Sequence, residues 1–159
     1  MDKKKLIEHF VIQIRKELEA ITTAAKNTYD IATHEDNKAE NKYDTRGLEA
    51  SYLAGAQAQR VSEMMDVLVV FETAKIKIFS AKDPIATTAL VEVSLNDKAS
   101  FVFIMPKGGG QSTVYAGQSI QVITPESPLG RTLIGKNVGE LVTFEAGSKT
   151  REYEIIALS

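Results

Sequence analysis

The residues best suited to chemistry lie in one short stretch, which begins with acids among amides and ends in a helix-like pattern. It contains His34 and a group of carboxylates that fall within ten residues of one another: Glu35, Asp36, Glu40 and Asp44. Carboxylate oxygens suit Mg²⁺, which usually takes one or two protein carboxylates and other ligands besides. A charge-rich turn is often only solvated, and this spacing is not a specific metal signature. Both interpretations therefore stay open from the spacing alone.

Other catalytic chemistries find little support in the residues. The only other histidine, His9, lies about seven helical turns from His34, and the chain has no cysteine, so a zinc site is not expected. No GxSxG elbow accompanies the serines, which argues against a serine hydrolase. In KGGGQST the lysine precedes the glycines, unlike in a phosphate-binding P-loop. That segment predicts a hairpin loop instead.

The composition bounds the class of protein. A chain of 159 residues fits one large domain or two small ones. Its net charge of −2 argues against a duplex-DNA binder, and the lack of cysteine excludes a disulfide scaffold. No apolar run reaches the roughly 18 residues of a membrane span, and the start MDKKKLIEHF lacks the features of a secretory signal. We therefore expect a cytoplasmic protein.

Two apolar stripes flank the acidic stretch and predict the elements that position it. Both run in steps of three and four residues. The first comprises Ile7, Phe10, Ile14, Leu18, Ile21, Ala25, Thr28 and Ala32, and the second comprises Ala50, Ala54, Ala58, Val61, Met65, Leu68 and Phe71. Two helices of roughly 30 residues would each be about 45 Å long. Since neither can bury its stripe alone, we expect an antiparallel hairpin close to a two-stranded coiled coil. Small residues near the turn (Ala24, Ala25, Ala54 and Ala58) would let the helices approach closely there.

The second half of the chain predicts strands. The candidates are residues 90–95, 101–105, 120–123, 141–144 and 153–158. Ser127 and Pro128 predict the cap and first position of a short helix that ends at Gly135. The chain should thus divide into a helical hairpin, residues 1–77, with an acidic tip near 33–44, and a second domain, residues 78–159.

The end of the chain carries an ordered series of motifs: IQVITPESPLGRTLIGKNVGELVTFEAGSKTREYEIIAL. It contains a Val/Ile-rich strand, a Ser-Pro with an arginine three residues after the proline, Leu-Ile-Gly-Lys, a Val-Gly-Glu turn and a final strand pair. This series, from Ile120 to Leu158, resembles the C-terminal domain of the bacterial transcript-cleavage factors GreA and GreB. The resemblance implies an α+β fold: an N-terminal antiparallel α-helical coiled-coil hairpin followed by an FKBP-like antiparallel β-sheet domain with a short helix.

The resemblance also implies a function. In that family the globular domain docks at the rim of the secondary channel of RNA polymerase and the hairpin enters the channel. Acidic tip residues help to hold a second Mg²⁺ that activates water to cut backtracked transcript. The implied protein is an accessory factor and not an enzyme. Its partner is RNA polymerase, it meets the 3′ end of the transcript only indirectly, and it uses no membrane. It has no cofactor of its own, since the Mg²⁺ belongs to the polymerase.

Family residues can be carried over to named positions. Asp36 and Glu40 would assist catalysis and bind the metal, with Glu35 as a further candidate ligand. The family's tip has an Asp–Glu interval of three, whereas the interval from Asp36 to Glu40 is four. Residues four apart still share a helix face. The resemblance places docking at Glu126, Ser127, Pro128 and Leu129, where Ser-Pro is also simply a helix start.

Two alternatives remain. The altered interval favours a channel-occupying regulator that binds RNA polymerase without stimulating cleavage. The implied FKBP-like fold raises a peptidyl-prolyl isomerase, although fold alone does not confer activity. The second domain has no tryptophan, and most of its aromatic residues lie at expected strand positions.

Overall fold

The computed structural model describes residues 1–33, 46–95, 98–146 and 149–159. The chain forms two compact units. One comprises Val11–Val69, and the other joins Met1–Phe10 to Val70–Ser159. In the described residues no helix is long and apolar enough to cross a membrane.

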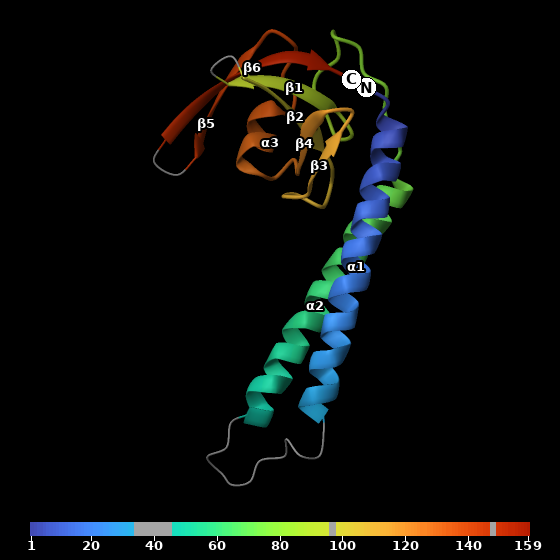
Figure 1. Cartoon of the computed structure of the whole chain (residues 1–159). Helices are drawn as coiled ribbons and strands as arrows, with labels where there is room; N and C mark the ends of the chain where they lie inside the picture. Colours follow the sequence, from blue (N-terminus) through green and yellow to red (C-terminus); the bar gives the residue numbers. More distant parts are fainter. Residues whose placement is uncertain (34–45, 96–97, 147–148) are drawn as a thin grey trace. The chain divides into compact units, whose positions relative to one another are not determined.

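Two long helices dominate the first half. Helix α1 covers Lys3–Thr33 with 31 residues, and α2 covers Arg46–Thr73 with 28 residues. The Asp2 carboxylate starts α1, since its Oδ1 accepts hydrogen bonds from the backbone N–H groups of Lys4 and Lys5 at 3.0 and 3.3 Å. Between Val11 and Val69 the helices run antiparallel, side by side (Figure 1). The predicted helical pair is confirmed.

The predicted stripe of α1 is confirmed through its first seven positions. Its residues are buried or half-buried: Ile7, Phe10, Ile14, Leu18, Ile21, Ala25 and Thr28. The last predicted member, Ala32, lies outside the residues whose side chains are described.

The predicted stripe of α2 is partly wrong. Ala58 and Met65 are exposed, while Gln57 and Met64 are half-buried in their place. Half-buried and buried positions follow alternating steps of three and four at 47, 50, 54, 57, 61, 64, 68 and 71, and positions 67 and 70 are half-buried besides. That alternation is the spacing of a coiled-coil seam. The seam therefore includes Gln57, although the neighbouring Ala58 is apolar.

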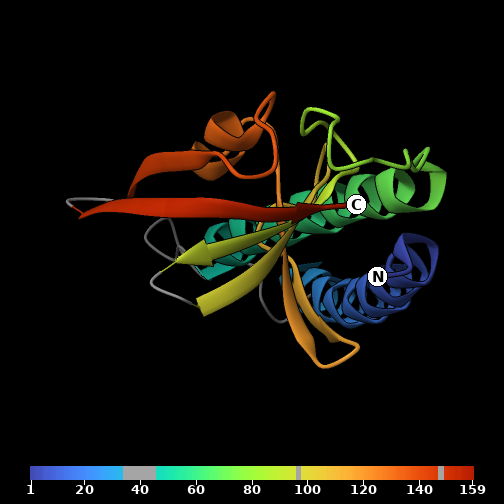
Figure 2. The same ribbon diagram turned by 90° about the horizontal axis from the view of Figure 1, so that it is seen from above.

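The second half forms one six-stranded sheet in the order β3-β4-β2-β1-β6-β5. The elements are β1 Leu90–Leu95, β2 Lys98–Ile104, β3 Ser112–Tyr115, β4 Gln118–Ile123, α3 Pro128–Leu133, β5 Leu141–Ala146 and β6 Lys149–Leu158. β2 and β4 pair in parallel, and the other neighbours pair antiparallel. The fold class is therefore confirmed, with a mixed sheet in place of a purely antiparallel one. Figure 2 shows α3 over one side of β5 and β6.

The five predicted strands are present, but the sequence did not predict β3. The glycine-rich segment 108–110 is also not a hairpin loop. It leads from β2 to β3, and β4 lies between those two strands in the sheet. Gly108 and Gly110 have φ angles of +85° and +93°, a region that glycine enters without the steric cost of a side chain.

The side chains of the sheet alternate between its two faces, and buried side chains lie on both. On one face Val102, Ile104 and Ile123 join a core that includes Leu133 of α3. On the other face Phe103 packs against Phe10 of α1, with ring centroids 6.4 Å apart, and Phe10 meets Phe71 of α2 at 5.4 Å. The bases of both helices therefore belong to the unit that holds the sheet.

Candidate functional site

The predicted tip residues Glu35, Asp36 and Glu40 lie outside the described residues, which stop at Thr33 and resume at Arg46. Within the described ranges, no group of three His, Cys, Asp or Glu side chains could hold a metal ion.

A groove lies between the helices close to the end of α1. It has a volume of 330 Å³ and is lined by Tyr29, Thr33, Ser51, Ala54, Gly55 and Ala58. The small residues Ala54 and Ala58 of α2 line this groove together with Gly55.

Large apolar side chains are exposed along the same part of the hairpin. The exposed fractions are 60% for Tyr29, 56% for Leu48, 72% for Tyr52 and 53% for Leu53. Leu48 and Tyr52 lie four residues apart and so share one face of α2. Clustered exposed apolar side chains commonly mark a surface that a partner covers.

The second predicted site is a turn that leads into α3. The backbone N–H of Ser127 donates to the Thr124 carbonyl at 3.0 Å, with Pro125 and Glu126 in the middle of the turn. The Ser127 hydroxyl donates to the same carbonyl at 2.7 Å and accepts from the Gly130 N–H at 3.1 Å. Ser127 is thus the predicted N-cap, and Pro128 occupies the first helical position.

Gly130 makes this turn possible. A Cβ atom at that position would lie 2.0 Å from the Thr124 carbonyl oxygen and 2.8 Å from the Ser127 Oγ. Real Cβ atoms do not approach backbone so closely, so the fold requires glycine here. Gly130 is buried, and the half-buried Leu129 beside it packs against the core.

The turn presents a small surface of mixed charge. Glu126 and Pro128 are exposed, whereas Ser127 and Leu129 are half-buried. Arg131 is also exposed, and its Nη2 lies 3.8 Å from Oε2 of Glu126. The sequence interpretation left Arg131 out of the site, although its place three residues after the proline puts it on the same exposed turn of helix.

The segment after α3 is tied to the rest of the unit. Gly135 donates its N–H to the Ile85 carbonyl at 2.8 Å, and Ile85 donates to the Lys136 carbonyl at 2.8 Å. Glu140 accepts from the Lys136 ammonium at 3.0 Å and from the Asn137 side chain and backbone, and these bonds lower the pKa of its carboxyl. Hydrogen bonds therefore hold both the turn and the segment after it, and the geometry shows no catalytic arrangement among the residues described.

Comparison with known proteins identifies relatives of the sheet-forming half first. Residues 109–159 match the family described as "Transcription elongation factor, GreA/GreB, C-term". The transcription elongation factor GreA of Chelativorans sp. (strain BNC1) is 30% identical over 115 residues, which cover 67% of this chain and 68% of the relative. The chain belongs to the GreA/GreB family.

A further relative extends the likeness over the helical half. GreA of Streptococcus agalactiae serotype Ia is 27% identical over 154 residues, covering 92% of this chain and 89% of the relative. The crystal structure of GreA factor homolog 1 of Thermus thermophilus covers 94% of both chains at 20% identity, with a TM-score of 0.38. As a GreA/GreB family member, the chain is an accessory transcription factor and not itself an enzyme.

Proposed function

We propose that this chain is a transcription elongation factor that binds RNA polymerase and stimulates cleavage of backtracked transcript. The hairpin, residues 1–77, would enter the secondary channel, and residues 78–159 would dock at its rim in the bacterial cytoplasm. The observation that carries the proposal is membership of the GreA/GreB family, in which the relatives described above are named transcription elongation factor GreA. They match this chain over both the helical and the sheet-forming halves.

The docking role falls to the turn around Ser127. Its backbone is fixed by three hydrogen bonds and by the close approach of Gly130 to Thr124. The exposed Glu126, Pro128 and Arg131 therefore stand on a preorganised support, and less conformational entropy is lost on binding. We assign the partner contact to Glu126, Ser127, Pro128 and Leu129, and we add Arg131.

The cleavage role falls to Asp36 and Glu40, with Glu35 as a further ligand. In the sequence they fall between α1 and α2, whose described parts expose the apolar side chains of Tyr29 and Tyr52. A protein channel would cover those side chains. The carboxylate donors fit Mg²⁺, which prefers oxygen ligands. When bound, a second metal ion stabilises the attacking and leaving oxygens of phosphodiester cleavage. The chain itself would contribute carboxylate oxygens at the end of a stiff helical pair.

The second candidate function is channel occupation without cleavage. It is favoured by the interval of four residues from Asp36 to Glu40, against three in the family pattern. A ligand misplaced by about 1 Å can cost roughly 100-fold in rate.

Adding the purified chain to stalled elongation complexes separates the two functions. Shortened transcripts support the factor that stimulates cleavage. Slowed synthesis with intact transcripts supports the occupying regulator. If the chain does not bind RNA polymerase in the same reaction, both proposals are wrong.

A double variant tests the interval itself. Ala39→Glu with Glu40→Asn moves the acid one position toward Asp36 and keeps the length of the chain. If the spacing limits cleavage, this variant shortens transcripts faster than the wild type does. A matched variant, Ala39→Gln with Glu40→Asn, has no acid at either position and controls for the change of side chains.

A further inference from the structure

The segment that connects α2 to the sheet has an unusual sequence, AKIKIFSAK, in which lysine and isoleucine alternate from residue 75 to 78. It forms no helix, strand or turn from Ala74 to Ser80. Ile78 is 89% exposed, the highest fraction among the exposed large apolar side chains of the described residues. This connecting segment is separate from the turn around Ser127.

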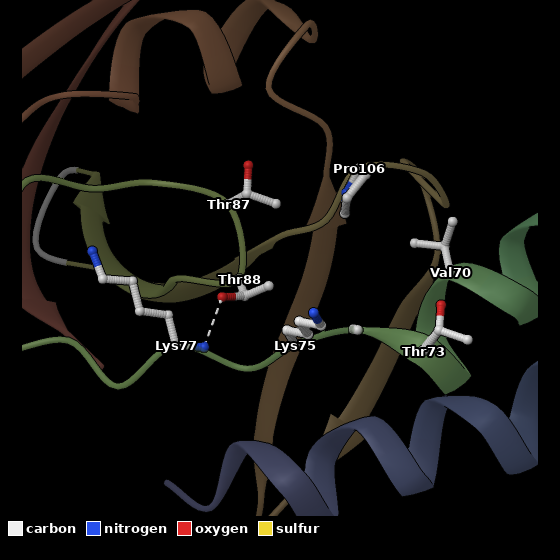
Figure 3. Close-up of a pocket in the computed structure, with 8 residues that line it drawn as sticks. Val70, Thr73, Lys75, Lys77, Thr87, Thr88 and Pro106 are labelled. Carbon is white, nitrogen blue, oxygen red and sulfur yellow. Dashed lines mark hydrogen bonds between the residues drawn. The ribbon is translucent and has the colours of Figure 1, made fainter.

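Thr88 holds the segment at its centre. The Lys77 N–H donates to Oγ1 of Thr88 at 3.1 Å, and the Lys77 carbonyl accepts a hydrogen bond from the Lys3 ammonium (Figure 3 shows the first bond). Thr88 itself has a φ of +69°, which is rare for a β-branched residue. Its own N–H and carbonyl are bonded to Ile104 and Lys3, so the surrounding structure maintains the strained conformation.

These bonds fix the direction of the neighbouring backbone groups. In an extended chain, the N–H and C=O of one residue point to the same side, and those of the next residue point to the other. Both groups of Lys77 are bonded to the protein, so an extended segment would direct those of Ile76 and Ile78 away from it. Among the described residues no hydrogen bond to the backbone groups of Ile76 or Ile78 is found. The segment is thus an open edge of the kind to which another chain can add a strand.

A pocket lies beside this edge. Its volume is 480 Å³, and it is lined by Val70, Ala74, Pro106 and Thr88 together with polar neighbours. Figure 3 shows Lys75 between Thr88 and Thr73, whereas the Lys77 side chain extends away from Val70 and Pro106. The pocket can therefore take an apolar side chain with a cation, Lys75, close by.

Lysines outnumber carboxylates around the edge. Lys75, Lys77 and Lys82 lie in the segment, which Glu72 precedes and Asp83 follows. Asp83 is engaged within its own turn, where it accepts from the N–H and hydroxyl of Ser80 at 2.7 and 3.0 Å. A second copy of this chain paired along the same edge would set lysine against lysine, which is unfavourable.

We propose that residues 75–78 form a docking edge for an extended acidic segment of a partner protein. The segment adds to the edge as a β-strand, through the backbone groups of Ile76 and Ile78. One of its apolar side chains enters the pocket beside Lys75, and its carboxylates pair with Lys75, Lys77 and Lys82. Backbone pairing supplies affinity, while the pocket and the lysines supply specificity.

The test uses the full chain and a defined peptide, about eight residues long, that alternates valine and glutamate. Backbone NMR should show shifted amide signals for Ile76 and Ile78 and slower hydrogen exchange at both positions. The Lys77 amide, already bonded to Thr88, should change less. Reversing two charges, Lys75→Glu with Lys82→Glu, should weaken binding about tenfold while leaving the Lys77 contacts in place. Lys98→Glu, at an exposed lysine of β2, is the matched control and should bind as the wild type does.

Three results would overturn the proposal. The first is an absence of change at Ile76 and Ile78 when the peptide is saturating. The second is equal binding of a peptide that alternates valine and lysine. The third is a set of shifts that maps to the sheet edges β3 or β5 instead. A peptide N-methylated at alternate residues keeps its charges but loses donors, and it should bind poorly if backbone pairing is the mode of binding.

Discussion

At the scale of single residues, Ser127 and Gly130 decide whether the proposed docking turn exists. The hydroxyl of Ser127 bonds to both the Thr124 carbonyl and the N–H of Gly130. The Thr124 carbonyl lies so close to Gly130 that a Cβ atom has no room there. The same two residues that shape the proposed docking surface also start α3. The Ser-Pro pattern predicted the cap, but the need for glycine at position 130 comes from a carbonyl six residues away and could not be inferred from the helix pattern.

Two substitutions test this turn by their effect on the free energy of unfolding. Ser127→Ala should cost about 1 kcal/mol because the N-cap is lost. Gly130→Ala should cost about 2–3 kcal/mol, since the methyl group forces the turn apart. Gly55→Ala is the matched control in α2, where a Cβ meets nothing within 4 Å. It should stabilise the chain by about 1 kcal/mol. Urea unfolding measures all three, and equal effects of the two glycine substitutions would contradict the geometry.

Lys3 is a second residue whose environment could not be predicted from the sequence. In MDKKKLIEHF it belongs to a run of three lysines, yet it is only 8% exposed. Its ammonium donates to the carbonyls of Lys77 and Thr88 and lies 4.8 Å from the centre of the Phe79 ring. Burial lowers the pKa of Lys3 from 10.5 to about 8. A run of three lysines is usually solvated, and only the packing of the connecting segment shows otherwise for Lys3.

The lowered pKa predicts a pH dependence with a definite sign. Between pH 8 and 10.5 the unfolded chain keeps the Lys3 proton that the folded chain has lost. The unfolded state binds more protons there, so this group makes the folded state more stable as the pH rises. The slope is at most about 1.4 kcal/mol per pH unit.

Urea unfolding of the wild type and Lys3→Met across this range isolates the contribution of Lys3. The stability of the wild type relative to the variant should rise with pH. Lys98→Met at an exposed position should show no such trend. A difference that stays constant or falls between pH 8 and 10.5 would contradict the assignment.

At the scale of elements, the spacing of a heptad decides which residues of α2 are buried, even where an apolar residue lies next to a polar one. The seam of α2 includes Gln57, whose Oε1 is buried without a hydrogen-bond partner in the described part of the chain. Sequence reasoning preferred the apolar Ala58 and Met65, which are exposed. The strands were more predictable because their short apolar runs match the sheet core. The exception, β3, has two exposed and two half-buried residues and so lacks an apolar run.

The unpaired Gln57 gives a test of the seam. Gln57→Leu removes a buried unsatisfied oxygen beside a cavity of 80 Å³ that Gln57 lines with Ile21 and Ala24. It should stabilise the chain by about 1 kcal/mol in urea unfolding. The control is Gln59→Leu, because Gln59 is exposed and bonds only to Glu63 at 2.9 Å. The control should change stability by less than about 0.5 kcal/mol. Destabilisation by Gln57→Leu would place that side chain outside the seam.

At the scale of the whole molecule, the sequence indicated the family and the order of its parts. A helical pair followed by a sheet with a short helix was predictable from periodicity and from the motifs between Ile120 and Leu158. What it could not reveal are contacts between distant segments, such as the Lys77–Thr88 bond. These depend on the packing of the whole unit and not on local pattern.

The most direct measurement of the proposed function is transcript cleavage in stalled elongation complexes with the variants Asp36→Ala and Glu40→Ala. Both variants should bind RNA polymerase as tightly as the wild type does, because the proposed docking turn is unchanged. Both should lose stimulated cleavage, since each removes a carboxylate from the tip. Asp30→Ala, an exposed acid of α1, is the control and should cleave normally. Normal cleavage by Asp36→Ala and Glu40→Ala would contradict the assignment of the tip.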